Sequence, residues 1–314
     1  MKLLMTYDYG PQAMAEIRAL GHEVLYIRES GLETSKQDLS DIEVLVCYNP
    51  FKDLDLEAMP ALRYILLSSI GIDQLPAERV MARNLVVTNN RGGYSKPMGE
   101  WIVWNLLSAF KNSAWFYDQQ RKKEWKITTD VLELVGKTIG FLGTGTIAQE
   151  AAKRLSGFEV RRIGLNTHGK PHEAFDQVYS ADDKLEFAGC CDAVVIALPQ
   201  TAQTEHFVNQ AFLDHMKPDA VLINISRGAV LDEAALVMAL GKERFRSVHL
   251  DVFDQEPLPK DHPLWEIDRV HITPHNSWIS EQRNNRRFEL ILENLKRLAD
   301  GEQLLNIVDV RRGY

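Results

Sequence analysis

A glycine-rich turn between an apolar run and a helical segment sets the strongest limit on the possible fold of this chain. Residues 138–142, T-I-G-F-L, have the length and composition of a buried strand. They lead into residues 143–148, G-T-G-T-I-A, and then into a segment of helical spacing that ends near Gly157. A strand, a glycine turn and a helix in this order are the context that a dinucleotide fingerprint requires. An ordinary βα turn is the alternative for this stretch alone.

The small residues of this turn have separate predicted roles. Gly143 would make the tight turn, and Gly145 would let the backbone approach a pyrophosphate. Ala148 would let the helix pack closely against the strand. The phosphates would then face unpaired N–H groups at the positive end of the helix.

Composition limits the remaining possibilities. A chain of 314 residues favours two domains, and 45% hydrophobic with 25% charged residues is typical of a soluble globular protein. The net charge of −8 argues mildly against nucleic acid or an anionic membrane as a partner. No signal peptide and no membrane-spanning run are recognisable, and the cysteines, Cys47, Cys190 and Cys191, have neither disulfide-framework nor zinc spacing. We expect a cytoplasmic protein without a metal.

The region before the fingerprint has repeated strand-then-helix patterns. A helix is expected at Pro11–Leu20, and strands are expected at Lys2–Thr6, Glu23–Ile27, Glu43–Cys47 and Leu62–Leu67. Ligands bind beyond the carboxyl ends of strands in open parallel sheets, so the loops after Cys47 and Leu67 are candidate ligand loops. The second contains Ser69, Ile70 and Gly71, whose N–H groups could face a carboxylate. An ordinary turn is equally compatible with this stretch.

A polar, turn-rich segment at Asn89–Lys96, just before Pro97, predicts a crossover between domains. Residues 98–110 are then densely apolar at helical spacing, and a basic, aromatic stretch follows at 115–125. The tryptophans of this region favour a subunit interface over a core position, because exposed aromatic patches are seldom without function.

The strand–helix alternation resumes after the fingerprint and predicts a parallel sheet with helices on both faces. Strands are expected at Val160–Leu165, Ala193–Leu198, Ala220–Ile225, Ser247–Leu250 and Val270–Ile272. A final amphipathic helix contains Phe288, Ile291 and Leu295 and is capped by Gly301. Residues 276–283 before it would form the second crossover.

The loop after the second strand of this region bears on cofactor choice. NAD sites usually place an acidic residue there, but this chain has the neutral Asn166, followed by Thr167, His168 and Lys170. A neutral side chain with positive charge nearby suits the 2′-phosphate of NADP better than a free hydroxyl. The alternative is an Asn that serves the ribose of NAD beside a solvated Lys170.

Three later strand ends carry titratable side chains. Arg227 follows one strand, Asp251 and Glu256 follow the next, and His275 follows the third. Each alone is usually a solvated loop residue. Together, above one dinucleotide site, an arginine, a carboxylate and a histidine predict a shared active site.

These residues carry a family resemblance that covers nearly the whole chain. The sequence resembles the NAD(P)-dependent D-isomer-specific 2-hydroxyacid dehydrogenases in the segments S-S-I-G-I-D at 68–73, G-T-G-T-I-A at 143–148, A-L-P-Q-T at 197–201, N-I-S-R-G-A-V-L-D-E at 224–233, D-V-F-D-Q-E-P-L at 251–258 and T-P-H at 273–275. The resemblance implies Arg227 as the substrate arginine, Glu256 as the carboxylate and His275 as the acid/base. It matches Asp251 to a residue that holds the cofactor carboxamide, and Ile70 and Gly71 to the loop that binds the substrate carboxylate.

The resemblance also implies an α/β fold of two doubly wound parallel-sheet domains. A Rossmann nucleotide domain, residues 98–280, would be inserted into a flavodoxin-like substrate domain, residues 1–97 plus 281–314. The 99–130 region would build a homodimer. The cofactor-binding residues are predicted to be Gly143, Gly145, Thr146, Ile147, Asn166, Thr167, His168, Lys170, Leu198, Pro199 and Asp251, and the substrate-binding residues Ser69, Ile70, Gly71, Arg227 and His275. The chain departs from the family at Asn166, which affects cofactor choice, and at Gly99, where alanine is commoner and only packing is affected.

Several functions are compatible with this fold. Formate enzymes resemble the chain but have Gln in place of Glu256. The pair of Glu256 and His275 therefore favours 2-hydroxyacid chemistry. In that reaction, hydride addition creates an oxyanion that the imidazole can protonate. A nucleotide-sensing, non-enzymatic scaffold and a phosphoglycerate-type dehydrogenase are the alternatives. Only Lys52 and Arg91 are available near Asn49 for a phosphate. The expected substrate is therefore a small unphosphorylated 2-oxo acid such as glyoxylate or hydroxypyruvate, with NADP preferred to NAD.

Overall fold

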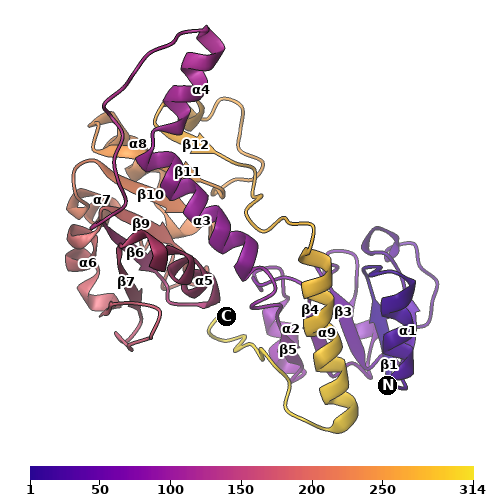
Figure 1. Cartoon of the computed structure of the whole chain (residues 1–314). Coiled ribbons are helices and arrows are strands. Elements are labelled where there is room, and N and C mark those ends of the chain that lie inside the picture. The colour runs from indigo at the N-terminus through magenta and orange to yellow at the C-terminus, as the bar shows by residue number, and fades with distance from the viewer. The chain divides into compact units, whose positions relative to one another are not determined.

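Two parallel β-sheets form the centres of two structural units (Figure 1). The computed structural model describes residues 1–314. Unit 1 comprises Met1–Tyr94 and Ser280–Tyr314, and unit 2 comprises Ser95–Ile279, so the second is inserted into the sequence of the first. The domain boundaries expected after residues 97 and 280, and the role of each domain, stay predictions.

Unit 1 has a five-stranded sheet in the order β2-β1-β3-β4-β5. This is the flavodoxin-like order, whose direction reverses between β1 and β3. The strands are β1 (Lys2–Met5), β2 (Glu23–Tyr26), β3 (Val44–Cys47), β4 (Tyr64–Leu67) and β5 (Val86–Thr88), and the helices are α1 (Pro11–Ala19), α2 (Ala77–Ala82) and α9 (Arg283–Asp300). The strand β5, with only three residues, was not predicted by the sequence pattern.

Alternating residues of these strands fill two separate cores. Leu3, Met5 and Val44 face α1 and α9, which lie against the same core. Leu4 and Leu45 face the opposite side, where they pack with residues of α2 and its neighbouring loops. The apolar face predicted for the last helix is confirmed, since Ile291 and Leu295 are buried there.

Unit 2 has a seven-stranded sheet in the order β12-β11-β10-β9-β6-β7-β8. Counted from β6, this is the Rossmann order 3-2-1-4-5-6 with one further edge strand. The strands are β6 (Thr138–Leu142), β7 (Arg161–Asn166), β8 (Gln177–Ser180), β9 (Ala193–Ile196), β10 (Ala220–Asn224), β11 (Phe245–Leu250) and β12 (Val270–Ile272). All pair in parallel, so the predicted fold class is confirmed.

The helices of unit 2 cover both faces of its sheet (Figure 1). They are α3 (Ser95–Phe110), α4 (Ser113–Lys122), α5 (Thr146–Leu155), α6 (Lys184–Cys190), α7 (Gln210–His215) and α8 (Glu233–Gly241). None of them, nor any helix of unit 1, combines the length and hydropathy that a membrane crossing requires.

The start of α3 differs from the sequence expectation. The polar crossover predicted at 89–96 ends earlier, because the helix already begins at Ser95. Pro97 lies in its first turn, where no intrahelical partner for a backbone N–H is needed. Further along α3, a Cβ added to Gly99 would lie 3.2 Å from the backbone of Glu150 and Ala151 in α5. The glycine therefore allows the two helices to approach closely.

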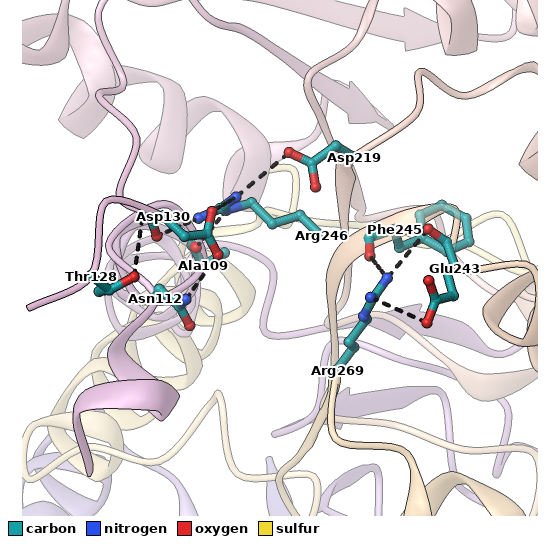
Figure 2. A network of polar contacts seen from close by, with 9 residues as sticks. All are labelled: Ala109, Asn112, Thr128, Asp130, Asp219, Glu243, Phe245, Arg246 and Arg269. Atoms are coloured by element: carbon teal, nitrogen blue, oxygen red, sulfur yellow. Dashed lines mark hydrogen bonds and ion pairs between the residues drawn. The ribbon is translucent and has the colours of Figure 1, made fainter. Parts of the chain in front are cut away.

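Arg246 on β11 anchors the segment that follows α4 (Figure 2). Its Nη1 lies 2.8 Å from Asp130 Oδ1 and 3.5 Å from Asp219 Oδ2, while its Nη2 donates to the Asp130 carbonyl at 3.0 Å. Its Nε donates to the Ala109 carbonyl at 3.1 Å, and Asn112 donates to Asp130 Oδ2. One nearly buried guanidinium thus ties the ends of α3 and of this segment to the sheet.

Candidate functional site

The predicted catalytic side chains follow three neighbouring strands. Arg227 lies beyond β10, Asp251 and Glu256 lie beyond β11, and His275 lies beyond β12. These strands are adjacent and parallel, so their carboxyl ends share one edge of the sheet. The three loops therefore emerge side by side.

His275 and Glu256 form a direct pair. The distance from His275 Nδ1 to Glu256 Oε2 is 2.8 Å, and both side chains are partly exposed. The second oxygen, Oε1, accepts a hydrogen bond from the Phe253 N–H at 3.0 Å. The carboxylate is thus fixed to its own loop while it orients the imidazole, which leaves Nε2 of the ring available to a ligand.

Asp251 organises the loop that carries His275. Its carboxylate is buried, with 2% of the residue exposed. Oδ1 accepts from Thr273 Oγ1 at 2.6 Å and from the Asn276 N–H at 2.8 Å, and Oδ2 accepts from the Ser277 N–H at 2.9 Å. His275 itself has a positive φ of 49° and donates its N–H to the Asp251 carbonyl at 2.7 Å. The carboxamide role predicted for Asp251 stays a prediction.

Arg227 belongs to a loop that Asn224 shapes from within. Asn224 Nδ2 donates to the Arg227 carbonyl at 3.1 Å, and its Oδ1 accepts from the N–H and hydroxyl of Ser226. The guanidinium donates through Nη1 to the Ser226 carbonyl at 2.8 Å. Asn224 is completely buried and therefore fixes the backbone from which the arginine projects.

Gly228 joins the loop of Arg227 to the loop of Glu256. A Cβ at this position would lie 1.9 Å from the Phe253 carbonyl carbon and 2.2 Å from the Asp254 nitrogen. Both contacts are to backbone, which cannot rotate away as a side chain can. Glu233 Oε1 holds the same segment by accepting from the Asp254 N–H at 2.8 Å, and burial raises the pKa of Glu233.

The glycine turn after β6 has the features of a pyrophosphate site. Gly143 has a φ of 97°, and a Cβ there would lie 2.7 Å from the Ala197 carbonyl oxygen beyond β9. At Gly145 an added Cβ would meet no protein atom within 4 Å, so the space before α5 is open. The helix has no side-chain cap, and no acceptor in the protein takes the N–H groups of Thr146, Ile147 and Ala148. These residues fit the phosphates of a dinucleotide.

The switch point of this sheet lies between β6 and β9. Leu198 and Pro199 follow β9 there, next to the glycine turn. The Pro199 carbonyl accepts from Thr204 Oγ1 at 2.6 Å, which fixes the course of this loop. Both predicted cofactor residues thus lie where doubly wound sheets bind ligands.

The side chain of Asn166 at the end of β7 is fully used by its own surroundings. Its Nδ2 donates to Thr144 Oγ1 at 3.2 Å and to the Lys170 carbonyl at 2.9 Å. Its Oδ1 accepts from the N–H groups of His168 and Lys170 at 3.2 and 2.9 Å. An amide can make about four hydrogen bonds in all, so Asn166 shapes the loop, and the exposed residues Thr167, His168 and Lys170 project from it.

The predicted carboxylate loop lies in unit 1, after β4. The carbonyl oxygens of residues 68–71 all accept hydrogen bonds, at 2.5 to 2.9 Å. The Ser68 carbonyl accepts from Tyr94 Oη, and the Ser69 carbonyl accepts from the Asn90 N–H. The Ile70 carbonyl accepts from Asn89 Nδ2, and the Gly71 carbonyl accepts from Ser69 Oγ. No hydrogen bond within the unit uses the N–H groups of Ser69, Ile70 and Gly71. Three consecutive unused donors are what an anion requires.

Sequence reasoning missed the residues that support these loops. Asn224, Gly228 and Glu233 hold the loops of the catalytic candidates, and Asn89, Asn90 and Tyr94 hold the carboxylate loop. Asn224, Gly228 and Glu233 lie inside a recognised motif, but the motif gives no role to them. The others lack a local signal, because their contacts join parts of the chain far apart in sequence.

Known proteins match this architecture. Residues 103–277 match the family described as D-isomer specific 2-hydroxyacid dehydrogenase, NAD binding domain. The chain is 32% identical over 281 residues to glyoxylate reductase from Thermofilum pendens, which covers 85% of this chain and 81% of that protein. It is 29% identical over 316 residues to D-3-phosphoglycerate dehydrogenase from Methanocaldococcus jannaschii, covering 99% of this chain but 60% of that longer protein.

A solved structure extends the match to the whole fold. A D-isomer specific 2-hydroxyacid dehydrogenase from Xanthobacter autotrophicus Py2, in complex with NADPH and MES, superposes with a TM-score of 0.86 at 28% identity. The alignment covers 100% of this chain and 99% of that one. Both units therefore have counterparts in that protein.

Proposed function

We propose, because the chain belongs to the D-isomer specific 2-hydroxyacid dehydrogenase family, that it reduces a small 2-oxo acid of the glyoxylate or hydroxypyruvate type. The enzyme is a nicotinamide-dependent oxidoreductase that acts on a CH–OH group or the corresponding carbonyl. One observation carries the proposal: the pair of His275 and Glu256 beyond strands that adjoin the strand of Arg227.

Each of these residues has a distinct role in this proposal. The carbonyl oxygen of a 2-oxo acid gains negative charge as hydride arrives, and a bound nicotinamide supplies that hydride. Nε2 of a protonated His275 donates the proton that neutralises the oxygen. The planar guanidinium of Arg227 binds the carboxylate and polarises the carbonyl. The unused N–H groups of Ser69–Gly71 in unit 1 remain predicted carboxylate donors.

Glu256→Gln is expected to lower kcat for oxo-acid reduction. The carboxylate 2.8 Å from Nδ1 orients the imidazole, and its negative charge complements the protonated ring, whereas a neutral amide does not. The amide can still accept from the Phe253 N–H, so the loop should keep its fold. The measurement is kcat and KM with the same oxo acid for both proteins. An unchanged kcat would mean that Glu256 serves only to hold its loop.

NADPH is expected to be used in preference to NADH, by less than about tenfold, because a charge-assisted contact at an exposed site contributes modestly. His168 and Lys170 approach the 2′-phosphate from a loop whose shape Asn166 maintains. The relative in complex with NADPH supports this preference. Equal or better kcat/KM with NADH at low salt would contradict it.

Asn166→Asp tests the origin of this preference. The carboxylate would repel a 2′-phosphate and accept from ribose hydroxyls, so the order of the two cofactors should reverse. Asn166→Ala is the control without an added charge: it removes the two hydrogen bonds donated by Nδ2, which the Asp variant also loses, together with the two that Oδ1 accepts. We expect the alanine variant to bind NADPH and NADH more weakly than the wild type, by similar factors.

The substrate class is tested with a panel of glyoxylate, hydroxypyruvate, pyruvate, longer 2-oxo acids and 3-phosphohydroxypyruvate, each with both nicotinamides. We expect the small unphosphorylated acids to have the highest kcat/KM. A preference for the phosphorylated acid would favour the phosphoglycerate-type alternative, which the relative from Methanocaldococcus jannaschii represents. Nucleotide binding without turnover of any member would favour the non-enzymatic scaffold.

The 99–130 region is the proposed homodimer surface. It exposes large apolar side chains, with Trp125 100%, Ile127 91% and Trp104 51% exposed. A second copy is the occupant that fits. Arg246 ties the base of this segment to the sheet (Figure 2), while the apolar residues of the segment are exposed. A cavity of about 740 Å³ borders α4 and β12 beside it.

Light scattering should therefore give twice the mass of one chain, and the double variant Trp125→Ser, Ile127→Ser should weaken the dimer. Met238→Ser, which changes an exposed apolar residue of α8 outside the region, is the control and should leave the mass unchanged. A monomeric wild type at micromolar concentration would contradict the assignment.

A further inference from the structure

A buried arginine in unit 1 has no carboxylate partner. Arg287 lies on the buried face of α9 and is 5% exposed. Its Nη2 donates to Ser68 Oγ at 2.6 Å, its Nη1 is 3.5 Å from Asn284 Oδ1, and its Nε has no partner at all. The guanidinium otherwise contacts aromatic rings, those of Tyr7, Tyr9 and Tyr48, whose centroids lie 5.1 to 5.9 Å away.

These residues gather at the switch point of the five-stranded sheet. Tyr7 and Tyr9 follow β1, Tyr48 follows β3, and Ser68 follows β4. The strand order reverses between β1 and β3, and doubly wound sheets bind ligands beyond such a reversal. The arginine therefore occupies a position where a ligand, rather than the sheet, is expected.

The surroundings leave the charge of Arg287 without compensation. Burial raises the pKa of Tyr9 to about 12 and also raises that of Tyr94, so neither phenol ionises near neutral pH. Glu29 reaches the same end of the sheet, but its Oε1 accepts from Thr6 Oγ1 and from the N–H groups of Tyr48 and Asn49. A guanidinium does not lose its proton, and a buried unpaired charge is costly.

Ser68 connects this charge to the candidate carboxylate loop. Its hydroxyl accepts from Arg287 and donates to the Cys47 carbonyl at 3.1 Å, and its residue begins the loop with three unused N–H groups. Asn90 connects the two a second time, since its Nδ2 donates to the Arg287 carbonyl at 3.0 Å and its N–H donates to the Ser69 carbonyl at 2.8 Å. The loop and the arginine thus form one hydrogen-bonded unit.

We propose that Arg287 is a positioning residue whose unneutralised charge, held behind the Ser68–Gly71 loop, makes that loop a binding site for the substrate carboxylate. The inference rests on the proposed function, and it assigns a cation of unit 1 to the substrate carboxylate. The carboxylate supplies the counter-charge that the guanidinium lacks, and the dry surroundings strengthen this attraction. The tyrosine rings hold the guanidinium in place by cation–π contacts without neutralising it.

The test compares Arg287→Met with Arg287→Lys. We expect the methionine variant to raise KM for the best 2-oxo acid about tenfold or more while kcat changes less than about threefold, as for a lost binding interaction. The lysine variant keeps the charge and should recover most of this loss. Arg297→Met is the matched control, because Arg297 lies on the same helix and pairs at the surface with Glu293 and Glu302. It should leave both parameters unchanged.

Binding of oxamate, a carboxylate that the enzyme cannot reduce, gives a readout that needs no reaction. In calorimetry with NADPH present, its Kd should rise about tenfold in Arg287→Met and little in Arg287→Lys, with NADPH binding itself unchanged. Oxamate binding by Arg287→Met equal to wild type overturns the inference even if turnover is normal. Absence of turnover with charge-dependent oxamate binding would instead count against the proposed function alone.

Two further outcomes are decisive. A lysine variant as impaired as the methionine variant would mean that the planar guanidinium of Arg287 has a structural role. That result would overturn the proposal that its charge attracts the substrate carboxylate. Should Arg287→Met fail to fold, as judged by circular dichroism, Ser68→Ala takes its place, because it removes the hydrogen bond that holds the guanidinium to the loop. A rise in KM of about threefold or more with unchanged kcat supports the inference, and an unchanged KM overturns it.

Discussion

Replacing His275 by alanine is expected to lower oxo-acid reduction by about 10²–10⁴-fold while nucleotide binding stays nearly intact. The imidazole is the proton donor for the oxygen that receives charge, and its Nδ1 is already paired with Glu256. The glycine turn that holds the nucleotide lies on other strands, after β6. The measurements are kcat/KM for the reduction and the Kd of NADPH by fluorescence.

A matched control separates this loss from a general effect of removing a histidine. His215 ends α7, is exposed and makes a side-chain hydrogen bond to the Ala211 carbonyl within its own helix, so His215→Ala should keep full activity. A His275→Ala rate within a few-fold of wild type would refute the acid/base assignment. Loss of NADPH binding in that variant would point to a collapsed loop instead.

The second large effect is expected for Gly228→Ala. The added Cβ would lie 1.9 Å from the Phe253 carbonyl carbon, a distance that no packing tolerates, so one of the two loops must move. Overpacking of this kind costs about 1–3 kcal/mol and occasionally more. Because one loop carries Arg227 and the other carries Glu256, we expect reduction to fall by at least about 100-fold together with the Tm.

Two other glycine variants make this prediction specific. Gly241→Ala adds a Cβ that meets no atom within 4 Å, so stability and activity should be unchanged. Gly145→Ala also meets no protein atom, but its Cβ enters the space before α5, so we expect a normal Tm and weaker NADPH binding. A Gly228→Ala protein with wild-type Tm and kcat/KM would show that the two loops do not depend on their close contact.

Local sequence patterns were enough to locate the candidate active-site residues along the chain. Hydrophobic runs and helical spacing depend on near neighbours, so they predicted most strands and the glycine turn at 143–148. A parallel sheet brings successive strand ends to one edge, and this rule placed Arg227, Glu256 and His275 together before any contact was known. The strands β5 and β8 were not predicted; both lie at the edge of a sheet, and β8 buries only one of its four side chains, so its apolar signal is weak.

Tertiary structure alone decided how each candidate is held. From the sequence, Asn166 is compatible with both NADP and NAD as the cofactor. In the structure its side chain makes four hydrogen bonds, and these shape the loop. The sequence pattern of the last helix shows only which side chains face the core or the surface. That Arg287 is buried among tyrosine rings and Ser68, without a carboxylate nearby, follows from how the strand ends are arranged in the fold. Gly228 differs from other glycines only by the backbone that lies against it. Burial, hydrogen-bond saturation and missing counter-charges depend on residues distant in sequence, and only the folded chain brings those together.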